Sequence, residues 1–249
     1  MPTPKRRAKG APSGPGAKAG KKVSETIRLK ASDGFELSAY VAKPSGTPKG
    51  GLVVIQEIFG VNGHIRRITD GFARDGFLAI APALFDRIEP GIELGYSPQD
   101  IERGLQLKSK SPTENALQDI EAARTAVANA GSVGVIGYCW GGVLAWLSAT
   151  RLQGFSAAVS YYGGGIGSVA EEQPNCPVLM HFGERDHAIP LADVNKVRAA
   201  HQQGVEIHVY PSGHGFNCDE RESYDPDSAR VARERTLRFL EAHLTSKSP

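Results

Sequence analysis

Cysteine is scarce in this 249-residue chain, which contains only three, at wide spacings and without a CxxC pair. An odd number at such spacings predicts neither a disulfide framework nor a zinc site, and a reducing, cytoplasmic location fits best. No apolar run approaches the ~18 residues of a membrane span, so we expect no membrane partner. Metal-ligand spacings such as HExxH are also missing, so the sequence predicts no metal and argues against a metallohydrolase.

The net charge is small as well, +2, but it is unevenly distributed. Residues 1–22 carry seven basic side chains and no acid, which leaves 22 basic and 27 acidic residues in the remainder. A mildly acidic body argues against a folded domain that binds nucleic acid. Rich in proline and glycine, residues 1–22 are predicted to be a disordered basic tail, with weak contact to RNA or anionic lipid as the alternative. No apolar stretch follows the basic start, so a signal peptide is not expected.

Turn signals and apolar runs alternate along residues 23–246, which we expect to form one domain. Two segments with strand alternation, Ser24–Ala31 and Phe35–Ala42, flank the hairpin dipeptide Asp33-Gly34. Apolar runs typical of buried parallel strands follow: Leu52–Ile55, Phe77–Ala81, Val133–Ile136, Ala157–Tyr161, Val178–Phe182 and Val205–Tyr210. Helix-like stretches lie between most of them: His64–Asp75, Thr113–Ala130, Val143–Thr150, Leu191–Gln203 and Asp227–His243.

This alternation predicts an α/β fold. Strands separated by helices imply right-handed crossovers and a mostly parallel sheet covered on both faces. Together with an N-terminal antiparallel hairpin, the pattern indicates a three-layer α/β/α sandwich of the α/β-hydrolase kind. In open parallel sheets ligands bind beyond the carboxyl ends of the strands, so the residues that follow each apolar run are the candidates for a site.

One such segment reads Gly137-Tyr138-Cys139-Trp140-Gly141-Gly142. It fits the G-x-nucleophile-x-G turn between a strand and a helix, with Cys139 as the nucleophile. The glycines are required because a side chain at either flanking position would strike the neighbouring backbone, and the helix N-terminus favours a thiolate. We therefore predict that Cys139 is catalytic rather than a buried structural thiol. Cys176 and Cys218 lack this context and are expected to be structural.

The partners of this nucleophile are expected downstream, in the order acid and then histidine. His214 lies between two glycines in a loop after the last apolar run, where it can swing toward the thiol. His187 is the alternative. Asp186, in the preceding loop, is predicted to hydrogen-bond the imidazole and hold its tautomer, with Glu184 as the alternative acid.

With these residues assembled, the chain resembles the dienelactone hydrolase (carboxymethylenebutenolidase) family of α/β-hydrolases. The resemblance spans roughly residues 24–244 and is carried by four motifs in order, within residues 56–62, 137–142, 183–186 and 213–216. It implies a cofactor-free hydrolase of a small ester or lactone, a monomer or weak homodimer. Its triad maps onto Cys139, Asp186 and His214.

The resemblance also implies roles for residues around the triad. The backbone N–H groups of Ile58 and Trp140 would form an oxyanion hole, and Glu57 would lie close to the thiol. A carboxylate at the end of a parallel strand can accept a proton or repel a thiolate there, although Glu57 can also be a solvated loop acid. Tyr138 and Trp140 are expected to wall the pocket, with core packing as the alternative.

Substrate recognition is implied for Arg87, which matches the family's arginine that binds the substrate carboxylate or pairs with that glutamate. A guanidinium suits planar carboxylates, but a surface salt bridge to Asp86 or Glu89 is the alternative. The chain departs from the dienelactone-processing members at one position. They carry a second arginine four residues after the triad histidine, where this chain has Cys218, which puts the recognition of a small carboxylated lactone in doubt.

These residues predict hydrolysis of a lactone or ester through an acyl-cysteine intermediate. A thioesterase or general carboxylesterase would use the same machinery, and only a substrate panel separates the three. The remaining alternative is a non-catalytic, thiol-bearing binding protein of the same fold. It predicts that Cys139 reacts with alkylating reagents no faster than an ordinary surface thiol.

Overall fold

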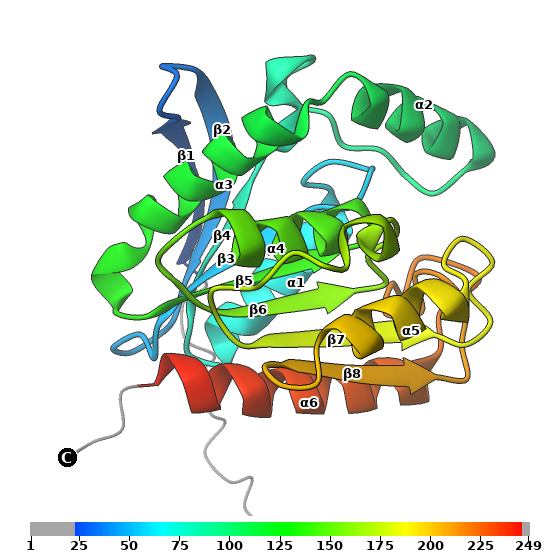
Figure 1. The fold of residues 1–249 in the computed structure, drawn as a ribbon. Helices are drawn as coiled ribbons and strands as arrows, with labels where there is room; N and C mark the ends of the chain where they lie inside the picture. The colour runs from blue at the N-terminus through cyan, green and yellow to red at the C-terminus, as the bar shows by residue number, and fades with distance from the viewer. Residues whose placement is uncertain (1–22, 246–249) are drawn as a thin grey trace, which may run out of the picture.

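An eight-stranded sheet forms the centre of the computed structural model, which describes residues 23–245 (Figure 1). The predictions for the tail, residues 1–22, lie outside the described residues. The strands are β1 (Val23–Lys30), β2 (Glu36–Lys43), β3 (Gly51–Ile55), β4 (Leu78–Pro82), β5 (Val133–Tyr138), β6 (Phe155–Tyr161), β7 (Val178–Gly183) and β8 (Val205–Tyr210). Their order is β1-β2-β4-β3-β5-β6-β7-β8; β1–β2 and β2–β4 pair antiparallel and all other pairs are parallel.

Helices cover both faces of this sheet. They are α1 (Gly63–Arg74), α2 (Pro98–Ser109), α3 (Thr113–Ala126), α4 (Trp140–Arg151), α5 (Leu191–Ala200) and α6 (Pro226–Leu244). Helices α1 and α6 pack on one face, and α3 and α4 pack on the other. The predicted three-layer α/β/α sandwich is therefore confirmed. Within the described residues, every helix is too short or too polar to cross a bilayer.

The predicted hairpin is present as β1 and β2, whose register pairs Lys30 with Glu36 next to the turn. Gly34 has φ +88°, a conformation that suits glycine, and Asp33 Oδ1 accepts a hydrogen bond of 3.0 Å from the backbone N–H of Phe35. Asp33-Gly34, the dipeptide that predicted the turn, therefore forms it.

The central strands are apolar because both of their faces are covered. Every residue of β3, β5 and β7 is buried. The run that became β8 was also expected to be buried, and this part of the prediction is wrong. β8 is an edge strand with one neighbour, most of its residues are partly exposed, and Val209 is 38% exposed.

Two helices have boundaries that differ by three or more residues in ways that bear on the fold, and a further helix was not predicted. The helix expected over Thr113–Ala130 ends at Ala126 and continues as a separate 3-10 turn over Ala128–Ala130. The helix expected to begin at Val143 starts at Trp140, immediately after Cys139. Helix α2 was not predicted, although Ser97 and Asp100 make a capping box at its start and Pro98 occupies the first helical position.

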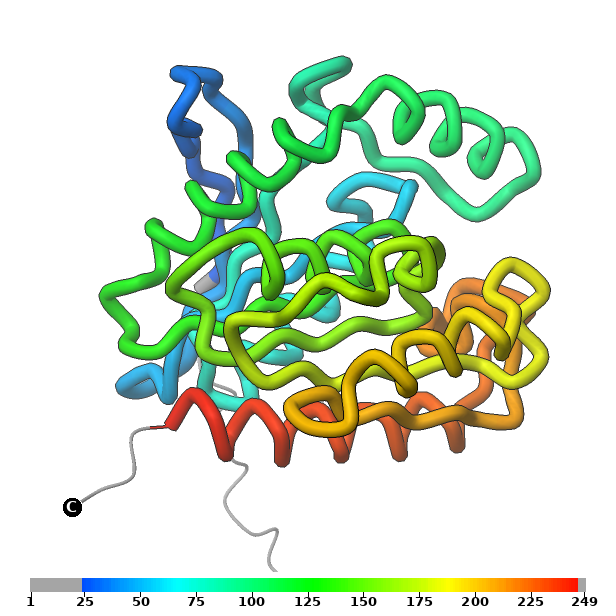
Figure 2. The backbone as a smooth tube through the Cα atoms, in the orientation of Figure 1, coloured from blue at the N-terminus to red at the C-terminus, as the bar shows by residue number. Residues whose placement is uncertain are grey.

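The carboxyl ends of the parallel strands gather several loops at one end of the molecule. Figures 1 and 2 show the segment after β8, in orange, beside the segment after β7, in yellow, beyond the tips of these strands. Helix α2 stands out from the body at the same end. The positions that the sequence singled out on separate strands are therefore brought together here.

Helix α6 should contribute strongly to stability through Leu240, which is fully buried beneath the sheet. Leu240→Ala should lower the free energy of unfolding by about 2–5 kcal/mol, because it leaves a cavity in a close-packed core. Urea denaturation measures this. Leu191→Ala, at a side chain that is 40% exposed, is the matched control and should change it by less than about 0.5 kcal/mol. Equal effects of the two substitutions would contradict the assigned packing.

Candidate active site

Cys139 lies at a strained turn between β5 and α4. Its backbone has φ 54° and ψ −114°, a region that non-glycine residues rarely adopt. The glycines around it are required by close backbone approach: a Cβ at Gly137 would lie 1.8 Å from the carbonyl oxygen of Gly141, and one at Gly141 would lie 2.5 Å from that of Gln56. The steric argument made from the sequence is therefore confirmed, and the turn presents the thiol at the N-terminus of α4.

His214 connects the other two predicted residues. Its Nε2 lies 3.1 Å from Sγ of Cys139, and its Nδ1 lies 2.7 Å from Oδ2 of Asp186. The Asp186 side chain is fully buried, and its Oδ1 accepts a hydrogen bond of 2.9 Å from the backbone N–H of Ala188. An aspartate so placed keeps the proton on Nδ1 and turns Nε2 toward the thiol. The alternatives Glu184 and His187 are exposed.

The surroundings of His214 favour its charged form. Burial by itself lowers the pKa of the imidazole, but its hydrogen bonds to Asp186 and Cys139 outweigh burial and raise the pKa from 6.5 to about 10. At neutral pH an imidazolium is therefore available beside the sulfur. Such a cation favours the thiolate form of a cysteine.

Cys139 and His214 open into a cavity of about 430 Å³. Ile58 and Trp140, the predicted oxyanion-hole residues, line it as well, and Trp140 stacks on Phe85 with ring centroids 5.2 Å apart. Most of the remaining wall is apolar: Phe59, Ile101, Leu105 and Ala188. Two cations, Lys108 and Arg221, also line it, together with the backbone of Gly164 and Gly165.

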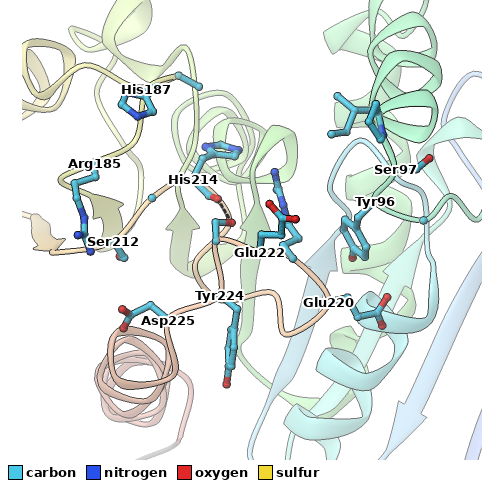
Figure 3. A pocket seen from close by; sticks show the side chains of 17 residues that line it. Tyr96, Ser97, Arg185, His187, Ser212, His214, Glu220, Glu222, Tyr224 and Asp225 are labelled. Atoms are coloured by element: carbon cyan, nitrogen blue, oxygen red, sulfur yellow. Dashed lines mark hydrogen bonds between the residues drawn. The ribbon is translucent and has the colours of Figure 1, made fainter.

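A wider groove of about 1240 Å³ meets this cavity at His214. In Figure 3, Tyr96 and Ser97 lie on one side of the groove and Arg185 and His187 on the other, with His214 between them. The hydroxyl of Ser223 donates a hydrogen bond of 2.6 Å to the backbone carbonyl of His214, which fixes the loop that carries the imidazole (Figure 3). A substrate can therefore reach His214 from a broad opening.

Tyr138 does not line the cavity, so the predicted role as a pocket wall is corrected. The residue belongs to β5, is 1% exposed, and its ring packs against Tyr161 at 4.8 Å and Tyr162 at 6.3 Å between centroids. Tyr138 is the last residue of β5 and points to the core, whereas Cys139 lies in the turn that follows the strand. The alternative of core packing holds for Tyr138, whereas Trp140 does wall the pocket.

Arg87 also lies elsewhere. Its guanidinium makes hydrogen bonds of 2.8 Å to both carboxylate oxygens of Asp119 and a 2.6 Å bond to Asp33. Asp119 is fully buried and needs this partner. Arg87 is therefore committed to joining the N-terminal hairpin to α3, and neither the predicted contact with Glu57 nor the alternatives Asp86 and Glu89 is its ion pair.

Glu57 is buried behind the site, and the cation nearest to its carboxylate is Arg221. The distance between Glu57 Oε1 and Arg221 Nη1 is 3.7 Å. Arg221 also lines both the cavity and the groove. The sequence analysis missed this residue; the available signal was its position seven residues after His214, in the same loop.

The other cysteines are unlike Cys139. Burial raises the pKa of Cys176 to about 11, and burial followed by the charge of Glu57 raises that of Cys218 to about 11. Both thiols are therefore poor nucleophiles at neutral pH. Cys218 was expected to be structural, and its side chain is fully buried.

Comparison with known proteins places these residues among hydrolases. The model of the dienelactone hydrolase family matches residues 37–244. A carboxymethylenebutenolidase of Pseudomonas putida is 34% identical over 240 residues, covering 91% of this chain and 100% of that protein. A protein of Synechocystis, provisionally given the same name, is 35% identical over 242 residues, covering 89% and 98%. A crystal structure from Klebsiella pneumoniae, provisionally named a dienelactone hydrolase, is similar with a TM-score of 0.76 and 32% identity, covering 87% and 98%.

The titration of His214 tests the geometry directly. Because Asp186 raises the pKa of the imidazole, Asp186→Asn should make His214 lose its proton at a lower pH than the value of about 10 in the unaltered protein. NMR of the imidazole resonances between pH 5 and 11 measures this. His187→Gln, an exposed histidine in the same groove, should leave the titration unchanged. If Asp186→Asn also left it unchanged, the assigned hydrogen bond would be absent in solution.

Proposed function

The chain belongs to the dienelactone hydrolase family, and on this premise we propose that it cleaves a lactone or carboxylic ester through a Cys139–His214–Asp186 triad. One observation carries the proposal: a single imidazole bridges a strained thiol, 3.1 Å away, and a buried carboxylate, 2.7 Å away. This is the arrangement that nucleophilic catalysis by cysteine requires. The predicted cytoplasmic location and monomeric or weakly dimeric state stay predictions.

In the first half-reaction the thiolate of Cys139 attacks the carbonyl carbon and forms a C–S bond, while the π electrons move to the oxygen. When the tetrahedral intermediate collapses, the C–O bond to the alcohol breaks. The departing alkoxide takes the proton from Nε2 of His214. The products of this step are an alcohol, or the ring-opened hydroxyl of a lactone, and an acyl-cysteine.

In the second half-reaction water releases the acyl group. Acylation removes the negative charge of the sulfur, which is one of the contacts that raise the pKa of His214. The imidazole can therefore take a proton from water, whose oxygen attacks the thioester carbonyl. The C–S bond then breaks, the acid leaves, and the pair of Cys139 and His214 is restored.

The oxyanion of both intermediates is assigned to the backbone N–H groups of Ile58 and Trp140. Both residues line the cavity beside Cys139, and Trp140 is the first residue of α4, where backbone N–H groups have no partner within the helix. Donors aimed at a developing oxyanion are typically worth ~10²–10³ in rate each. Glu57 precedes Ile58 and is ion-paired with Arg221; its role as a charge near the nucleophile stays a prediction.

The cations at the cavity suggest where a substrate carboxylate would bind. Arg87 is occupied by two aspartates, whereas Arg221 lines the cavity together with His214. We assign carboxylate recognition to Arg221, in place of the family position that Cys218 holds here. The apolar walls around Ile58, Ile101 and Leu105 favour a second candidate, an esterase for neutral acyl groups.

Replacing the nucleophile gives the first functional test. Cys139→Ala should lower kcat for dienelactone, aryl esters and thioesters by at least ~10³-fold, because removing one member of a triad removes the covalent path. A spectrophotometric assay with these three substrate classes measures it. Cys176→Ala, which removes a thiol outside the cavity, is the matched control and should keep the activity of the unaltered protein.

Two outcomes would contradict the proposal. Full activity of Cys139→Ala would exclude the acyl-cysteine. If Cys139 were also alkylated by iodoacetamide no faster than Cys176, the protein would be a thiol-bearing binding protein rather than a hydrolase of this mechanism.

The preference for a charged substrate is tested by replacing Arg221 and Arg87 one at a time with glutamine. Arg221→Gln should raise KM for carboxylated lactones roughly 10- to 100-fold relative to neutral esters, because a hydrogen bond to a charged group is worth about 1.5–3 kcal/mol. Arg87→Gln should leave this ratio unchanged and lower the free energy of unfolding, since it leaves the buried Asp119 without its partner. Equal losses of Arg221→Gln on charged and neutral substrates would remove the assigned role.

A further inference from the structure

A second cluster of reactive side chains lies behind the proposed triad. Glu57 follows β3, His64 lies in the first turn of α1, and Cys218 belongs to the loop between β8 and α6. All three are buried, and a carboxylate oxygen, a ring nitrogen and a sulfur from them all lie within 4.8 Å of one another. Two segments distant in sequence, residues 57–64 and the loop after β8, thus bring three metal-ligating groups to one point.

Atoms of this cluster are buried without hydrogen-bond partners. Both carboxylate oxygens of Glu57 and Nε2 of His64 have none among the residues that the structure describes. The guanidinium of Arg221, at 3.7 Å from Glu57, is beyond hydrogen-bond distance. Buried polar atoms without partners are costly and rare, so those of residues 57 and 64 call for a ligand that they share.

His64 and Cys218 have polar neighbours of the kind that orient metal ligands in known sites. Nδ1 of His64 lies 3.3 Å from a carboxylate oxygen of Asp219, which places the proton on Nδ1 and leaves the lone pair on Nε2. The hydroxyl of Tyr96 accepts a hydrogen bond of 3.2 Å from Asn62, which leaves its own proton free to be donated toward the sulfur of Cys218. A carboxylate behind a histidine and a donor toward a sulfur are common around metal sites.

The chemistry of the three groups selects the ion. A mixed set of sulfur, imidazole nitrogen and carboxylate oxygen suits Zn²⁺ and similar transition metals, whereas Mg²⁺ and Ca²⁺ prefer oxygen alone. The ion would replace the thiol proton of Cys218, and its two positive charges would balance that thiolate and the carboxylate of Glu57. A buried, oppositely charged centre thereby lowers the cost of a carboxylate whose two oxygens accept no hydrogen bond among the described residues.

We propose that Glu57, His64 and Cys218 form a binding site for one divalent transition-metal ion, with Zn²⁺ as the expected occupant. The site is separate from the Cys139–His214–Asp186 triad and does not depend on the function proposed for it. The bound ion would tie the loop that carries Ile58 to the loop that carries His214, and so hold the two sides of the cavity together. This inference replaces the expectation of a metal-free protein.

Cobalt is the probe for this site, because a Co²⁺–thiolate bond absorbs in the near ultraviolet and tetrahedral Co²⁺ in the visible. Co²⁺ added to the full-length, chelator-treated protein should give both bands, saturate at one equivalent and be displaced by Zn²⁺. Cys218→Ser should abolish the thiolate band, and both it and His64→Gln should weaken binding at least ~100-fold, since even the loss of an outer partner costs 10- to 100-fold. Circular dichroism checks that the variants fold.

The other cysteines supply matched controls. Cys176→Ser and Cys139→Ser should both keep the band and the single equivalent. A second readout works on the unaltered chain: Zn²⁺ should protect Cys218, but not Cys176, from alkylation, as peptide mass spectrometry can show. The proposal is overturned if no ion binds, if Cys139→Ser abolishes the band while Cys218→Ser keeps it, or if Zn²⁺ leaves the alkylation of Cys218 unchanged.

Discussion

The hydrogen bond between Nδ1 of His214 and Asp186 is the interaction on which the site depends, because it joins loops that follow two different strands. Because Nδ1 is hydrogen-bonded to Asp186, the imidazole ring is oriented with Nε2 toward Sγ of Cys139. The imidazole can exchange a proton with the thiol only if the sulfur has a fixed position, and the strained backbone of Cys139 fixes the position of the sulfur. The parallel sheet makes both conditions possible, since it places the ends of β5, β7 and β8 at one edge.

Much of this arrangement could be predicted from the sequence because its determinants are local. Buried strands show as apolar runs, and the turn at Cys139 shows as glycines whose substitution would drive a Cβ into backbone. Cys139, Asp186 and His214 were found because strand ends in a parallel sheet converge, whatever the loops do. Helix α2 was missed because its apolar residues are few and Leu105 is 51% exposed, although Ser97 and Asp100 mark its start.

The errors concern side chains whose partners come from distant segments. Arg87 has the right side chain to bind a carboxylate, but its guanidinium is already paired with Asp33 of the hairpin and Asp119 of α3. Arg221 carries no local motif, and its position beside the cavity follows from the path of the loop after β8. Tyr138, the last residue of β5, packs against Tyr161 and Tyr162, and the motif around Cys139 carries no sign of these partners.

Glu57 links the two parts of the account. It precedes Ile58, so a ligand that binds its carboxylate would also fix the position of Ile58 at one side of the cavity. Its carboxylate lies close to the buried side chains of His64 and Cys218.

The central claim, an acyl group carried by Cys139, is tested most directly by mass spectrometry of protein quenched in acid during turnover of an aryl ester. The account predicts that the protein gains the mass of one acyl group, located on the peptide that contains Cys139. Sustained turnover with no such adduct, or an adduct on another residue, would contradict it.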